Sequence, residues 1–205
     1  MSTPKGCRQY LRLAPLALLG MATFAAAQAP LSKLERASNG ATSVRNGQHD
    51  FDFDMGTWKT QSSRLLRPLT GSTTWTELEG VTVVAPVWAG RANLAEYKGS
   101  GPGGSVELLS LRWYNPLSHQ WYLDFATPKG GALGTPNVGE FRNGRGDFYD
   151  VESIGDRTIL LRFSIWRIDD DHAQSEQAFS DNGGKTWEIN WINKYTRIAA
   201  TSSSQ

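Results

Sequence analysis

Apolar and polar residues alternate along most of the chain after residue 57, with the two-residue period of strands that bury one face. Turn residues (Gly, Pro, Asn and Asp) interrupt the alternation at spacings of roughly 8–12 residues, and no helical period appears there. This spacing favours an antiparallel all-β barrel or sandwich. The pattern predicts about ten strands, at residues 58–68, 73–88, 91–98, 106–114, 120–127, 138–142, 147–153, 157–168, 173–180 and 186–198.

The alternation of apolar and polar residues changes in two places. Phe51 and Phe53 alternate with aspartates just before the first strand, which predicts an extended segment with one buried face. Gly80 interrupts the strand at residues 73–88 and predicts a bulge or a sharp bend.

The first 29 residues have the three parts of an export signal. Lys5, Arg8 and Arg12 precede an apolar stretch at residues 13–24, and Ala27-Gln28-Ala29 fits a cleavage site. The apolar stretch is shorter than the roughly 20 residues of a membrane-spanning helix. We therefore predict a cleaved signal peptide and a periplasmic or secreted protein, with an uncleaved hydrophobic anchor as the alternative.

The remaining chain divides into a polar segment and one domain. Residues 30–48 predict a tether or lid over one end of the fold, with a short helix between Ser32 and Gly40. Residues 49–200 contain the strand pattern and predict a single barrel domain.

Cysteine content and charge exclude several functions for the mature chain. Cys7 lies in the signal segment, so disulfides and thiol catalysis are excluded after cleavage. Cleavage also removes three basic residues and no acidic one, which changes the formal charge from +1 to −2. With no basic stripe, nothing points to nucleic acid as a partner.

Gly56-Thr57-Trp58 on the first strand and Arg197 on the last resemble the closure signature of lipocalin and calycin barrels. The resemblance implies an antiparallel up-and-down barrel of about 8–10 strands in which Arg197 lies across the ring of Trp58. A guanidinium over an indole is favourable by about 0.5–2 kcal/mol.

Longer motifs resemble a group of exported bacterial calycin-like proteins of unknown function. The start of the domain, Phe51 to Trp58, matches F-D-F-x-x-G-x-W, and residues 176–191 match E-Q-A-F-S-x-x-G-G-x-T-W-E-x-N-W. The resemblance covers nearly the whole mature chain. It implies a cavity of the lipocalin kind but no particular activity.

The segment from Ser180 to Trp187 is similar to an Asp-box, with Asn182 in place of the aspartate. Such boxes repeat in sialidase propellers, but one copy in a chain of this length does not make a propeller. We interpret the segment as a structural hairpin in which the side chain of Asn182 binds turn amides.

Polar side chains within apolar strands are the candidate binding residues. Arg112 and Arg162 each interrupt an apolar run, and a buried arginine needs a partner or a ligand. The sequence leaves open which strand face lines the cavity, because the same residues fit a solvent-facing position. The candidate ligand-binding residues are Arg112, Tyr114, Arg162, Ser164, Trp166, Glu176 and Asn190, and the catalytic candidates are Arg162, Glu176, Arg112 and Tyr122.

Metal and cofactor chemistry has little support. His49, His119 and His172 do not have the spacing of metal ligands, and only His172 comes late enough for a haem ligand of the nitrobindin kind. The pairs Glu77/Glu79 and Asp150/Glu152 each share a strand face, which a solvated face explains equally well. We expect no metal and no cofactor.

Three functions remain open. The first is a barrel that binds a small apolar or aromatic molecule in its cavity. The second is a cofactor-free isomerase, cyclase, lyase or hydratase in which an arginine stabilises an oxyanion and Glu176 or a tyrosine moves the proton. The third is a structural protein with a filled core.

Overall fold

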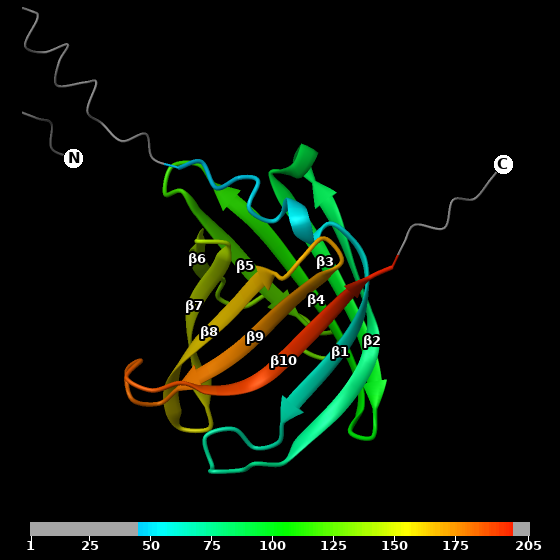
Figure 1. Cartoon of the computed structure of the whole chain (residues 1–205). Helices are drawn as coiled ribbons and strands as arrows, with labels where there is room; N and C mark the ends of the chain where they lie inside the picture. The colour runs from blue at the N-terminus through cyan, green and yellow to red at the C-terminus, as the bar shows by residue number, and fades with distance from the viewer. Residues whose placement is uncertain (1–44, 199–205) are drawn as a thin grey trace, which may run out of the picture. The chain divides into compact units, whose positions relative to one another are not determined.

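The computed structural model describes residues 45–198, which form a closed antiparallel β-barrel (Figure 1). Each strand pairs with the next one in the chain, and β10 closes the ring on β1. The strands are β1 (Gly56–Leu65), β2 (Trp75–Val87), β3 (Ala92–Gly101), β4 (Gly104–Asn115), β5 (Gln120–Ala126), β6 (Asn137–Arg142), β7 (Arg145–Ile154), β8 (Arg157–Arg167), β9 (His172–Ser180) and β10 (Glu188–Arg197). Two short 3-10 helices accompany them, η1 (Asp52–Asp54) and η2 (Trp88–Gly90). The predicted all-β antiparallel barrel is confirmed, whereas the short helix predicted between Ser32 and Gly40 lies outside the described residues.

Strand β2 continues through Gly80 without a bulge. Its register with both neighbouring strands is unbroken at this position. A Cβ atom on Gly80 would lie 2.0 Å from the carbonyl oxygen of Lys98. The glycine therefore allows the backbones of β2 and β3 to approach each other closely. The bulge predicted there is therefore wrong. A register shift occurs instead in β10, where Asn190 is the extra residue.

Replacing Gly80 by alanine should destabilise the barrel by about 1–3 kcal/mol, because the added methyl group must displace the backbone of β3. Gly134→Ala is the matched control, since a Cβ atom at Gly134 meets nothing within 4 Å. Its effect should stay below about 0.5 kcal/mol. Urea unfolding followed by tryptophan fluorescence measures both variants, and equal midpoints would contradict the close approach.

Residues 45–55 cross one end of the barrel, and we call this segment the plug (Figure 1). The extended conformation predicted for Phe51 to Asp54 is wrong, since turns lead directly into η1. In a 3-10 helix, residues three apart lie on one face. Phe51 and Asp54 are accordingly both buried, while Asp52 faces solvent. The burial of this segment thus follows a three-residue period rather than the alternation of Phe and Asp.

Phe51 anchors the plug in an aromatic cluster inside the barrel. Its ring is fully buried, and its centroid lies 4.8 Å from that of Trp121, 4.9 Å from Phe141 and 5.7 Å from Phe148. Burying a side chain of this size contributes about 1.5–3 kcal/mol. This end of the barrel is therefore closed by the packing of the plug, in addition to the hydrogen bonds between the strands.

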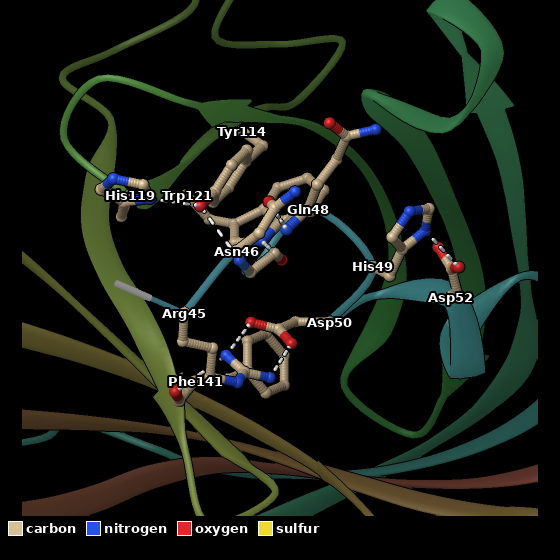
Figure 2. A network of polar contacts seen from close by, with 11 residues as sticks. Arg45, Asn46, Gln48, His49, Asp50, Asp52, Tyr114, His119, Trp121 and Phe141 are labelled. Atoms are coloured by element: carbon tan, nitrogen blue, oxygen red, sulfur yellow. Dashed lines mark hydrogen bonds and ion pairs between the residues drawn. The ribbon is translucent and has the colours of Figure 1, made fainter. Parts of the chain in front are cut away.

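Polar contacts fix the first residues of the plug against β4 and β5 (Figure 2). The backbone N–H of Gly47 donates to the Tyr114 hydroxyl at 3.0 Å. The indole N–H of Trp121 donates to the Gly47 carbonyl at 2.9 Å. Arg45 forms an ion pair with Asp50 within the plug. These contacts hold the segment in place across the rim.

The contact predicted between Trp58 and Arg197 is present. The guanidinium carbon of Arg197 lies 4.0 Å from the centroid of the Trp58 ring, and the two residues are paired in the β1–β10 ladder. The same guanidinium donates to the carbonyls of Phe53 at 2.8 Å and Met55 at 2.7 Å. The indole N–H of Trp58 donates to the Asp54 carbonyl at 2.8 Å. The pair therefore joins the first strand, the last strand and the plug.

The loop between β1 and β2 covers part of the opposite end. Leu69 packs against Ile159, Leu161 and Phe179, and its backbone N–H donates to the Glu188 carboxylate at 2.6 Å. Both barrel ends are thus covered by chain outside the strands.

The hairpin at Ser180 to Trp187 has the local structure expected from its Asp-box-like sequence. The Asn182 side-chain oxygen accepts the backbone N–H of Thr186 at 3.0 Å, and the Trp187 indole N–H donates to the Gly184 carbonyl at 3.1 Å. These bonds within the turn account for the motif without a ligand.

Strand β6 is short, and this interrupts the barrel wall. Its pairing with β5 ends at Leu123 and Asn137, while β7 continues past its last β6 partner for residues 150–154. We call this interruption the β5–β7 gap. Asp124 holds the loop at residues 127–136 beside it, because its carboxylate accepts the backbone N–H of Gly134 at 2.9 Å.

Candidate functional site

The barrel encloses a cavity of about 150 Å³, to which every strand from β2 to β10 contributes a side chain. Its position in the lumen follows from the fold, because alternate residues of each strand point inward.

One side of the cavity is polar and already hydrogen-bonded. Asn193 on β10 accepts from the Ser62 hydroxyl at 2.6 Å and donates to Ser175 at 3.0 Å. Ser175 and the Tyr195 hydroxyl share a bond of 2.8 Å. Burial raises the pKa of Tyr195 to about 12, so its phenol stays protonated at neutral pH. These groups shape the cavity but do not supply a base.

The other side of the cavity is apolar and aromatic. Phe125 on β5 and Phe163 on β8 meet edge to face with centroids 5.5 Å apart, and Leu108 and Leu161 extend this wall. An edge-to-face pair presents both a ring face and a ring edge, which suits a flat apolar molecule.

A buried ion pair forms the part of the cavity nearest the plug. Arg112 on β4 donates to the Asp54 carboxylate at 2.5 Å and to the Ser110 hydroxyl at 3.3 Å. Its guanidinium carbon lies 4.8 Å from the Phe51 ring centroid. Arg112 is 5% exposed and Asp54 is 3% exposed, so each charge depends on the other for compensation.

Asn137 lines the cavity and has a buried side-chain nitrogen without a partner in the described part of the chain. The residue is 3% exposed and lines the lumen at the start of β6. Its side-chain nitrogen has no hydrogen-bond partner within residues 45–198. An unsatisfied buried donor costs about 1–3 kcal/mol, which an acceptor on a ligand would recover.

Glu152 is a carboxylate of the cavity lining, on the part of β7 that borders the β5–β7 gap. Although the residue is solvent-exposed, atoms at the cavity rim partly desolvate its carboxylate and raise its pKa, and Asp150 raises it further. No cation forms an ion pair with Glu152 in the part of the chain that the structure describes.

The structure brings only Arg112 and Tyr114 of the predicted ligand-binding residues into the barrel interior. Arg112 lines the cavity, whereas Tyr114 belongs to the aromatic cluster beneath the plug. The Tyr114 hydroxyl is used by Gly47 and His119.

Arg162, Ser164 and Trp166 lie on the outer face of β8, which corrects the lumenal arrangement considered for them. Leu161 and Phe163 line the cavity, so the alternate residues point outward. Every second residue from Ile159 to Ile165 is apolar and faces inward, whereas Arg162 and Ser164 on the other face are polar, so the alternation agrees with the observed arrangement. The Arg162 guanidinium carbon lies 4.7 Å from the ring centroid of Trp187, which belongs to the outer hairpin.

Glu176 is also on the outer face and does not pair with Arg162. It stands opposite Ser164 in the β8–β9 ladder, and its carboxylate lies 3.7 Å from the guanidinium of Arg145. Arg145 in turn lies over Trp166, with its guanidinium carbon 4.3 Å from the ring centroid. The outer face thus carries its own charge network.

The remaining candidates lie away from the cavity. Tyr122 alternates with the inward-facing Leu123 and stacks on Trp113, with centroids 5.6 Å apart. Asn190 is the buried bulge residue of β10 and is not among the residues that line the cavity.

Of the residues that line the cavity, only Arg112 was among the predicted site residues. Asn137 and Glu152 are two of those that were missed, and Asp54, the partner of Arg112, was missed as well. The burial of Asp54 could be predicted only if the 3-10 turn of the plug were already known. Asn137 directly follows a proline at the start of a strand, where the sequence does not indicate to which side of the sheet the side chain points. Glu152 shares a strand face with Asp150, and only the closed barrel turns that face inward.

The histidines do not form a metal site. His172 is exposed and bonds Asp169 at 2.8 Å, and this hydrogen bond lowers the pKa of Asp169. Within residues 45–198 no group of three or more His, Cys, Asp or Glu side chains is arranged to hold a metal ion. None of the helices found between residues 45 and 198 is long and apolar enough to span a membrane.

Comparison with known proteins finds only distant structural likeness. No family model matches the chain, and no curated protein matches it. Among solved structures, the chain is similar to the redesigned β-barrel mFAP0 bound to DFHBI, with a TM-score of 0.40, 10% identity, and coverage of 71% of this chain and 99% of that one. It is also similar to the redesigned barrel mFAP1 bound to DFHBI, with a TM-score of 0.39, 10% identity, and coverage of 75% and 100%. Likeness at this level is confined to the barrel.

Proposed function

We propose that the protein binds a small, mostly aromatic molecule in the barrel cavity, through an acceptor group that meets Asn137. The observation that carries this proposal is the buried side-chain nitrogen of Asn137, which lines the cavity without a partner in residues 45–198. A structural protein with a filled core would not have the cavity.

The size of the cavity limits the ligand. A cavity of about 150 Å³ in a protein core is enough for a benzene-sized molecule. The edge-to-face pair of Phe125 and Phe163 supplies a wall that fits one aromatic ring. We therefore propose a single-ring compound with a carbonyl, hydroxyl or ether oxygen.

Catalysis in this cavity has less support than binding. Arg162, Glu176 and Tyr122, which were candidates for the chemistry, lie on the outer face, and Arg112 is held by Asp54. Within residues 45–198, the arginine that lines the cavity is Arg112, and its ion pair with Asp54 occupies both groups, which leaves the enzyme hypothesis with less support.

The N-terminal export signal supports a place of action in the periplasm or outside the cell. Membership of the exported calycin-like group is likewise a proposal, supported by the sequence motifs at residues 51–58 and 176–191.

Asn137→Leu should weaken the binding of benzaldehyde about tenfold and leave the binding of toluene unchanged, because only benzaldehyde has an acceptor for the amide. Titrations of both compounds into the purified protein, followed by calorimetry, measure the difference.

Ala95→Leu is the matched control, since Ala95 lines the same cavity and the larger side chain fills it. Both compounds should lose affinity in this variant. If neither compound binds the unmodified protein, or if both bind the filled variant equally well, the cavity is not the binding site.

A further inference from the structure

We infer that the cavity selects a cationic aromatic molecule, whose ammonium group meets Glu152 while its ring packs against Phe125 and Phe163. The inference rests on the proposed function and adds the charge of the ligand. Four observations support it. Asp150 and Glu152 on β7 have no ion pair in the described residues, and Arg112 is already paired with Asp54. The β5–β7 gap leaves part of β7 uncovered by β6, and the side-chain nitrogen of Asn137 has no partner within residues 45–198.

The carboxylates of β7 lie on the inward face. Asp150 and Glu152 stand opposite Leu161 and Ile159 in the β7–β8 ladder, and cross-strand partners point to the same side of a sheet. Leu161 lines the cavity, so Asp150 shares its face, and Glu152 is itself part of the lining. Two negative charges are thus placed side by side at the rim of an aromatic cavity.

Neither carboxylate is neutralised by the barrel. Within residues 45–198, the ion pairs of the structure include neither Asp150 nor Glu152. Arg112 in the cavity lining is paired with Asp54, and Arg64 stacks on Trp191 with its guanidinium carbon 4.9 Å from the ring centroid. The proximity of Asp150 also raises the pKa of Glu152, as expected where a negative charge lacks compensation. A cation brought to this position would relieve the repulsion.

The aromatic lining of the cavity also favours a positively charged ligand. Phe125 and Phe163 line the cavity, and the face of an aromatic ring attracts a cation by about 0.5–2 kcal/mol. The ring of Trp191 already has the guanidinium of Arg64 over it. A carboxylate ligand would meet both the phenylalanine ring faces and Glu152 with the unfavourable sign. Arg112 in the cavity lining is neutralised by Asp54, and Arg64 lies over Trp191 at an exposed position.

The β5–β7 gap places Glu152 where a ligand can reach it. Beyond Tyr149, β7 has no β6 partner, so the strand edge that carries Glu152 is not covered by β6. Asn137 belongs to the last β5–β6 pair beside the same gap, it lines the cavity, and its buried side-chain nitrogen has no partner within residues 45–198. A ligand in the lumen would therefore have an acceptor site for its ammonium and a donor site for its oxygen on adjacent strands.

Benzylamine, benzyl alcohol and benzoate form a matched probe set of one size and three charges. At neutral pH and low salt, benzylamine should bind about tenfold more tightly than benzyl alcohol, and benzoate should bind most weakly, as measured by calorimetry. Glu152→Gln should reduce the affinity for benzylamine to that for benzyl alcohol and leave benzyl alcohol unchanged. Glu107→Gln is the control, because it removes an equal charge from an exposed position on β4.

The outcomes separate the two proposals. If benzyl alcohol binds but benzylamine has no advantage, or if benzoate binds best, the inferred charge preference is wrong and the cavity proposal stands. If Glu107→Gln reduces benzylamine binding as much as Glu152→Gln does, the preference comes from the overall charge and not from Glu152. If none of the three compounds binds, the proposed function itself is wrong.

Discussion

Replacing Arg112 by methionine should lower the free energy of unfolding by about 3–5 kcal/mol, because the substitution leaves the carboxylate of Asp54 buried without a counter-charge. Asp54 is 3% exposed, and its only ion pair in the described residues is with Arg112 at 2.5 Å. Asp54→Leu should cost a similar amount for the converse reason, since the guanidinium would lose its carboxylate. Guanidinium chloride unfolding of each single variant measures the loss.

The double variant Asp54→Leu/Arg112→Met should recover most of that stability. It removes both charges together and roughly conserves the volume of the pair, and such replacements are often neutral or stabilising. A double variant that is as unstable as the sum of the singles would show that the charges do not compensate each other. A loss below about 1 kcal/mol for Arg112→Met would likewise contradict the buried pair.

The ion pair also explains how the plug is placed. Asp54 comes from the segment before β1, and Arg112 comes from β4, which lies on a different part of the barrel wall. Arg112 further touches Phe51, so charge pairing and aromatic packing orient the same segment. A plug that is fixed at both Phe51 and Asp54 determines how deep the cavity can be.

The strands could be predicted from the sequence because their pattern is local. Alternation with turn residues between strands is a property of a few neighbouring residues, and it located all ten strands to within a few positions. The contact of Trp58 with Arg197 was predicted from the resemblance of the two positions to the closure signature of lipocalin and calycin barrels. The structure pairs these two residues directly in the ladder.

The cavity lining was harder to predict, because it depends on the face that each strand turns inward. In β8 the face of Leu161 and Phe163 is apolar from Ile159 to Ile165, but the face of Arg162 also carries the apolar Leu160 and Trp166, which made it a second candidate for the lumen. The outer face of this strand is covered by Trp187, which comes from a hairpin about 25 residues later in the chain. Such long-range cover weakens the polar signal that normally marks an outer face.

Asp54 shows a second limit of local reasoning. Its place beside Phe53 predicts a polar outer position under a strand period, while the 3-10 turn buries it beside Phe51. The partner that makes this burial tolerable lies 58 residues later. A buried charge can therefore be identified only when both members of the pair are known.

Trp58→Ala should be the other strongly destabilising substitution, with an expected cost of about 3–5 kcal/mol from the cavity that it leaves. Trp58 is 1% exposed, packs near Tyr195 with centroids 6.4 Å apart, and donates its indole N–H to the plug. Thermal and urea unfolding should both show the loss. A cost near 1 kcal/mol would mean that the site collapses around the smaller side chain.

Arg197→Met should cost less than Trp58→Ala, about 1–3 kcal/mol, since it removes the contact with the ring and leaves the carbonyls of Phe53 and Met55 without their donor. The double variant should be less destabilised than the sum of the singles by about 0.5–2 kcal/mol, because the guanidinium has no ring to cover once Trp58 is absent. Arg64→Met is the matched control, as Arg64 stacks on Trp191 at an exposed position and should change stability by less than about 0.5 kcal/mol. Strict additivity of the Trp58 and Arg197 variants would show that the two side chains close the barrel independently.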